Sequence, residues 1–102
     1  MPLSTQQAHY LRGLTHHLHP VVTVAGKGLS DSVLAELEAA LVKHELIKVK
    51  LRASREVRKT WIEEIGRHFK AERIHVIGQV ACFYKRNARK PVIDLPGAAD
   101  AG

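Results

Sequence analysis

The chain has 102 residues, 45% of them hydrophobic, so its size and composition fit one folded domain and exclude global disorder. Its 16 lysines and arginines outnumber its 10 acidic residues, and a net charge of +6 suits a polyanionic partner such as a nucleic acid. No apolar run reaches the roughly 18 residues of a membrane helix, and the amino-terminal residues lack the pattern of a signal peptide. The single cysteine, Cys82, has no intramolecular disulfide partner. We therefore expect a reduced, cytoplasmic, monomeric protein with no membrane contact.

A helix is predicted over residues 4–15, because Ser4 and Gln7 have the spacing of a capping box. Pro20 prevents this helix from continuing and leads into a β-branched strand over residues 21–24.

The strand runs into a short glycine loop, and Ser30 then caps a helix that reaches about His44. A strand, a glycine turn and a helix start present free backbone N–H groups where the helix dipole favours an anion. Lys27 adds a positive charge at the same place. This predicts a phosphate site, whereas the alternative is a plain turn with glycines for geometry. The residues that would hold the phosphate are Gly26, Lys27, Gly28 and Leu29.

Residues 46–52 alternate with the period of a β-strand. One face carries Ile47, Val49 and Leu51, and the opposite face carries the cations Lys48, Lys50 and Arg52. A row of like charges needs solvent, a salt partner or a bound polyanion, and solvation alone explains it about as well as RNA does.

A third helix is predicted over residues 55–70, with Ser54 as its N-cap. Trp61 lies within its apolar stripe, and an aromatic residue in such a stripe usually belongs to the core. The predicted stripe contains Val57, Trp61, Ile62, Ile65 and Phe69. The first turns carry the cations Arg55, Arg58 and Lys59.

Two further strands, residues 74–77 and 80–84, are joined by the two-residue hairpin turn at residues 78–79. Tyr84 ends the second strand, where its ring would either stack on RNA or pack against the sheet edge. The cations Lys85 and Arg86 follow it.

The end of the chain is a basic loop over residues 87–91 followed by an apolar stretch. Val92, Ile93 and Leu95 are expected to dock as an extended segment. We place a single domain over residues 1–96 and a flexible tail over residues 97–102.

The predicted order is therefore α-β-α-β-α-β-β, a two-layer α/β domain. Alternating strands and helices favour right-handed crossovers with the helices mainly on one face. The other face would be open and would display Lys48, Lys50 and Arg52.

No catalytic constellation emerges, and we expect no enzyme activity and no cofactor. The glycine loop lacks the Gly-Lys-Ser/Thr ending of a P-loop. His16, His17 and His19 invite a metal interpretation, but they lie at a helix end before a proline, where histidine suits the helix dipole. We predict no metal site.

Five blocks match a known family in order and spacing: LSTQQAHYLRGL, PVVTVAGKGLS, VLAELEAAL, HELIKVKL and IHVIGQVACFYKR. They resemble the CRM domain (chloroplast RNA splicing and ribosome maturation), above all its stand-alone bacterial form, the YhbY-like proteins. The resemblance covers about residues 3–96. It implies an RNA-binding domain with a four-stranded mixed sheet, similar to the C-terminal domain of a bacterial translation initiation factor, and a role on precursors of the large ribosomal subunit.

In that family the strand-to-helix loop carries a GxxG signature, likened to the RNA-clamping loop of KH domains. The matching residues here are Ala25, Gly26, Lys27 and Gly28, so alanine replaces the first glycine. If that position needs a positive φ, alanine costs about 1 kcal/mol; otherwise the backbone there is ordinary or Gly26 takes over.

We therefore expect an RNA-binding assembly factor in which residues 26–29 anchor one phosphate. The strand cations and the cluster at residues 55–59 would track neighbouring phosphates, with Lys85 and Arg86 at the far edge. The alternatives are an adaptor that docks on a ribosomal protein or an assembly GTPase and, more weakly, a small nucleotide-binding enzyme.

Overall fold

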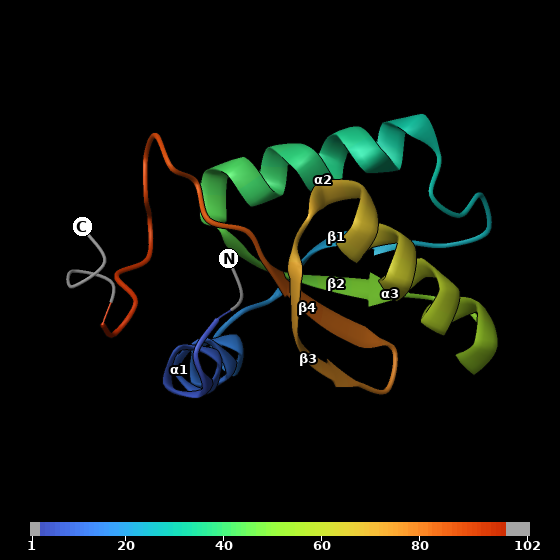
Figure 1. Cartoon of the computed structure of the whole chain (residues 1–102). Helices are drawn as coiled ribbons and strands as arrows, with labels where there is room; N and C mark the ends of the chain where they lie inside the picture. Colours follow the sequence, from blue (N-terminus) through green and yellow to red (C-terminus); the bar gives the residue numbers. More distant parts are fainter. Residues whose placement is uncertain (1–2, 98–102) are drawn as a thin grey trace.

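The computed structural model describes residues 3–97 and contains three helices and one four-stranded sheet (Figure 1). The sheet order is β1-β2-β4-β3, with β1 and β2 parallel and the other pairs antiparallel, which confirms the predicted mixed sheet. The predicted order of elements is also confirmed. Their bounds are α1 (Thr5–Thr15), β1 (Pro20–Val24), α2 (Asp31–His44), β2 (Leu46–Leu51), α3 (Arg55–Phe69), β3 (Glu72–Ile77) and β4 (Val80–Tyr84).

Each helix begins at the serine that the sequence indicates. The hydroxyls of Ser4, Ser30 and Ser54 each accept a hydrogen bond from the amide three residues later, which satisfies one donor that the first turn leaves free. Gln7 completes the capping box of α1. Helix α3 ends one residue earlier than predicted, because Lys70 adopts a left-handed conformation with φ of 55°. Within residues 3–97, no helix is both long and apolar enough to cross a bilayer.

Helices α2 and α3 cover one face of the sheet, and the main core lies between these two layers (Figure 1). Strand β2 supplies Ile47, Val49 and Leu51 to this core, as its alternation predicts. Helix α3 packs mainly through Ile65 and Phe69 in its second half. The prediction that Val57 belongs to the inner stripe is wrong, since this side chain near the start of α3 is 41% exposed.

The second face of the sheet is covered at one end by α1, so the expectation of a fully open face is wrong. A separate apolar cluster joins Leu11 of α1 to Leu46 and Tyr84 of the sheet. Tyr84 is buried there, so of its two predicted roles the structure shows packing against the sheet. Beyond α1 the face is open, with Lys50 exposed and Lys48 half-buried.

The segment after β4 folds back along α1. Ile93 and Leu95 pack on the Leu11 cluster as predicted, whereas the side chain of Val92 is exposed. The carbonyl of Pro96 accepts a hydrogen bond of 3.2 Å from Nε2 of Gln7, which ties the end of the domain to α1. Most of the predicted flexible tail, residues 98–102, lies outside the described residues.

Candidate nucleic-acid interface

Three connections meet at one end of the sheet, which we call the loop end: residues 25–30, residues 52–54 and the hairpin turn at residues 78–79 (Figure 1). The amide of Arg52 donates to the carbonyl of Val24 at 2.8 Å, and the amide of Leu51 donates to the carbonyl of Gln79 at 2.6 Å. These bonds hold the three connections side by side. The parallel pairing of β1 and β2 brings the first two connections to the same edge, and the antiparallel pairing of Lys50 with Val80 brings the hairpin turn there.

The glycine loop is a tight turn closed by a hydrogen bond of 2.7 Å from the amide of Gly28 to the carbonyl of Ala25. Gly28 has a φ of 63°, and a Cβ atom added there would lie 3.6 Å from Nε1 of Trp61. Ala25 does not have a positive φ; among the described non-glycine residues, only Glu45 and Lys70 do. The backbone at Ala25 is therefore ordinary, and alanine in place of the family glycine causes no strain.

The first turns of α2 and α3 both begin at the loop end, because each helix follows one of the two parallel strands. In each helix the capping serine accepts a hydrogen bond from one backbone amide of the first turn. The dipoles of both helices add positive potential at this end. Asp31 and Glu56 lie in these first turns and reduce that potential. The neighbouring side chains then decide whether an anion is favoured.

Cations from three segments surround these helix starts. Lys27, Arg52, Arg55 and Lys59 are exposed, and Arg58 is half-buried. Nη1 of Arg58 donates a hydrogen bond of 2.7 Å to the carbonyl of Ala53, which fixes its guanidinium against the start of α3. The structure thus brings together most of the residues that the sequence predicts for phosphate binding.

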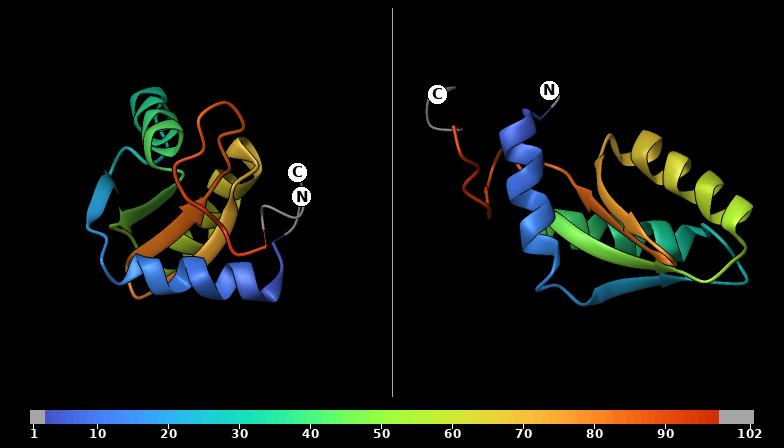
Figure 2. Two further views of the ribbon diagram at one scale, coloured as in Figure 1. Left: turned by 90° about the vertical axis from the view of Figure 1, so that its left-hand side faces the viewer. Right: turned by 90° about the horizontal axis from the view of Figure 1, so that it is seen from below.

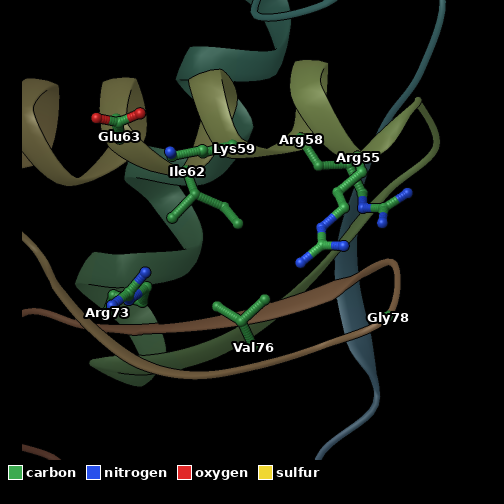
Figure 3. A pocket seen from close by; sticks show the side chains of 8 residues that line it. All are labelled: Arg55, Arg58, Lys59, Ile62, Glu63, Arg73, Val76 and Gly78. Atoms are coloured by element: carbon green, nitrogen blue, oxygen red, sulfur yellow. The ribbon is translucent and has the colours of Figure 1, made fainter.

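A groove of about 640 Å³ lies beside this cluster, between α3 and β3 (Figure 3). Arg73 of β3 lines it, a residue that the sequence-based site omits. No sequence signal singled out Arg73, because its position depends on how β3 pairs with β4. The groove is lined by Arg55, Arg58, Lys59, Ile62, Glu63, Arg73, Val76 and Gly78.

The predicted site residues Lys48 and Lys50 lie on the open face. Lys50 pairs with Val80 beside the hairpin turn, whereas Lys48 pairs with Cys82, farther from the loop end. Lys48 shares that face with His75, whose ring lies 6.4 Å from that of His16 at the end of α1. Partial burial and the nearby cations Arg12, His16 and Lys48 lower the pKa of His75. This second group of cations was not predicted as a cluster.

At the opposite end of the sheet β4 ends beside the start of β2, and the segment that follows β4 passes close to α1 (Figure 2). Lys85 and Arg86 come directly after β4, at this opposite end. At about 3.3 Å per residue, the length of β2 separates them from the loop end by roughly 17 Å. Lys85 and Arg86 are therefore not part of the cluster of cations at the loop end.

The opposite end is built around Glu45, a fully buried carboxylate that the sequence did not mark as special. Its carboxylate accepts hydrogen bonds from the amides of Asn87 at 2.6 Å and of Val92 and Ile93 at 2.7 Å. Its own carbonyl accepts the amide of Lys85 at 2.9 Å. Glu45 therefore fixes the carboxy-terminal segment and has a structural role.

Cys82 is buried as predicted, and burial raises the pKa of its thiol. Across residues 3–97 no group of three or more histidine, cysteine or acidic side chains is placed to hold a metal ion, and this includes His16, His17 and His19.

Comparison with known proteins defines the class. The CRS1/YhbY (CRM) domain model matches residues 3–85. The chain belongs to this family, as the resemblance in the sequence predicts. An RNA-binding protein of Haemophilus influenzae is 47% identical over 95 residues, covering 92% of this chain and 95% of that protein. A probable RNA-binding protein of Pseudomonas aeruginosa is 41% identical over 90 residues, covering 87% and 86% of the two chains.

A solved structure shows the same fold. The solution structure of a Staphylococcus aureus protein, described as a candidate RNA-binding protein, superimposes with a TM-score of 0.77 at 26% identity. The match covers 93% of this chain and all of that one.

Proposed function

We propose that the protein binds RNA through the loop end. The observation that carries this proposal is the meeting of the glycine loop, two helix starts and five cations at one end of the sheet. Lys27 and the first-turn amides would hold one phosphate, and Arg52, Arg55, Arg58 and Lys59 would contact neighbouring phosphates. The names of the relatives as RNA-binding proteins support the same chemistry.

The direct test is charge reversal at the loop. Lys27→Glu should weaken binding of a short single-stranded RNA by about tenfold at moderate salt, because a phosphate contact is replaced by repulsion. Lys27 is exposed, so the fold should be unchanged. Lys85→Glu is the matched control at the opposite end and should leave the affinity for the same short RNA nearly unchanged. Equal effects of the two variants would remove the loop from the site.

The target that we propose is ribosomal RNA in precursors of the large subunit, with the protein acting as a cytoplasmic monomer that assists assembly. This part rests on the resemblance to the YhbY-like proteins. CRM is an RNA-binding domain family rather than an enzyme family, and we propose no catalytic step. In-cell crosslinking should place the contacts on large-subunit RNA. Contacts spread evenly over messenger RNA would contradict this target, and capture of a protein partner without RNA would favour an adaptor role.

A further inference from the structure

The groove between α3 and β3 has a polar rim and an apolar middle (Figure 3). Arg55 and Arg58 lie at the end near the hairpin turn, and Arg73 lies at the other end. Between them Ile62 of α3 and Val76 of β3 point towards each other, while the carboxylate of Glu63 points away from the strand (Figure 3). With Lys59 of α3, four cations therefore border a hollow whose floor is apolar.

A bulge in β3 creates this lining. Arg73 pairs with Phe83 and Val76 pairs with Ala81, with the register shift between Arg73 and His75. Phe83 and Ala81 lie two residues apart and face the helix layer. In a regular strand, residues three apart point to opposite faces, so the bulge is what turns Arg73 and Val76 to the same side.

The hollow lies beside the first half of α3, where Trp61 and Ile62 are only partly buried against the core. The fully buried residues of α3 are Ile65 and Phe69 in its second half, and the sheet edge beneath the first half is β3, the outermost strand. Val76 is accordingly 39% exposed, although it faces α3. An apolar side chain left exposed between arginines on an edge strand is available to a ligand.

We propose that this groove binds an unstacked nucleotide of single-stranded RNA, a subsite that rests on the proposed RNA binding at the loop end. The base packs between Ile62 and Val76, and Arg55, Arg58 and Arg73 contact the phosphates on either side of it. The volume of about 640 Å³ lies within the range of about 300–1,000 Å³ seen for small-ligand sites. A base in a duplex is paired and stacked, so it cannot enter. The subsite therefore makes the protein prefer single-stranded segments.

The first test compares Arg73→Gln with Arg67→Gln. Both changes remove one exposed arginine, but Arg67 of α3 does not line the groove. With a short single-stranded RNA as the probe, Arg73→Gln should lower affinity by about tenfold and Arg67→Gln by less than about twofold. Equal losses of affinity in the two variants would overturn the subsite, because they would show only a general effect of positive charge.

The second test removes the base rather than the charge. An oligonucleotide with abasic positions should bind the wild type about tenfold more weakly than the intact strand, and a duplex of the same sequence should also bind more weakly. In Val76→Thr, a nearly isosteric change on an exposed strand, the penalty for abasic positions should shrink. Equal binding of intact and abasic strands, or equal competition by a polyglutamate peptide, would overturn the proposal.

The two proposals fail in different ways. If the wild type binds no RNA, or if Lys27→Glu has no effect, the proposed function fails. If RNA binds and Lys27→Glu weakens it, but Arg73 behaves like Arg67 and the base makes no difference, the groove alone is excluded.

Discussion

The two ends of the sheet are both basic, yet they are built in opposite ways. At the loop end, cations surround two helix starts and an open groove. At the opposite end, Lys85 and Arg86 belong to a segment whose backbone amides are bound by the buried carboxylate of Glu45. Positive charge alone therefore does not mark the binding site. The more informative difference is whether the backbone donors near the cations already have a partner in the protein.

The largest expected effect is on stability, at the opposite end. Glu45→Ala removes a buried acceptor and leaves three amides without it, which should lower the free energy of unfolding by about 2–4 kcal/mol. Urea denaturation measures this change, and Glu38→Ala on the exposed side of α2 is the control.

The folded Glu45→Ala variant should still bind a short single-stranded RNA with nearly wild-type affinity, measured at a temperature well below its unfolding. A loss of affinity as large as that of Lys27→Glu would mean that the two ends form one binding surface, and the contrast between them would be wrong.

The open face lies between the two ends and provides the next test. Replacing Lys48, Lys50 and Arg52 together by glutamine should lower RNA affinity by about tenfold at low salt. It should also reduce the slope of log affinity against log salt by about 0.7 for each phosphate contact that is lost. An unchanged slope would show that the open-face lysines Lys48 and Lys50 are only solvated, and it would also remove Arg52 from the proposed site at the loop end.

A smaller effect is expected within the glycine loop. Gly28→Ala places a Cβ atom at a φ of 63° and should lower the free energy of unfolding by about 1 kcal/mol. Gly26→Ala is a matched control, since Gly26 has no positive φ and no heavy atom lies within 4 Å of a Cβ built there. Thermal unfolding of both variants measures the difference, and equal losses would contradict this account of the loop.

The smallest expected effect is a pH dependence at His75. Its pKa is lowered in the folded state, so the unfolded chain binds the proton more tightly. Stability should therefore fall as the pH drops through the usual histidine value of about 6.5. His75→Gln should remove this contribution. Urea titrations from about pH 7.5 to 5.5 should give a shallower decline for the variant, and parallel declines would contradict the assignment.

Local patterns in the sequence predict much of this fold. The three capping serines, the alternation of β2 and the hairpin turn at residues 78–79 each depend on near neighbours, and each is confirmed. The glycine loop and the cluster at residues 55–59 were also found from such patterns. Parallel strand pairing then places the two side by side.

The remaining features depend on contacts that are distant in the sequence. The hydrogen-bond partners of the Glu45 carboxylate lie 42 to 48 residues away, so nothing near it reveals its role. Arg73 joins the groove only because of a bulge in β3, and a regular alternation would assign it or Val76 to the wrong face. Val57 has helical spacing with the core residues of α3, but it lies in the first turn of the helix, where its side chain is 41% exposed.

The most direct test of the central claim is a map of backbone amide chemical shifts during titration with a short single-stranded RNA. We predict the largest changes at Lys27, Gly28 and the first two turns of α3, and then at Arg73 and Val76. The amides of Asn87, Val92 and Ile93, which Glu45 holds, should not shift. If these three amides showed the largest chemical-shift changes and the amides of the glycine loop did not shift, RNA binding at the loop end would be contradicted.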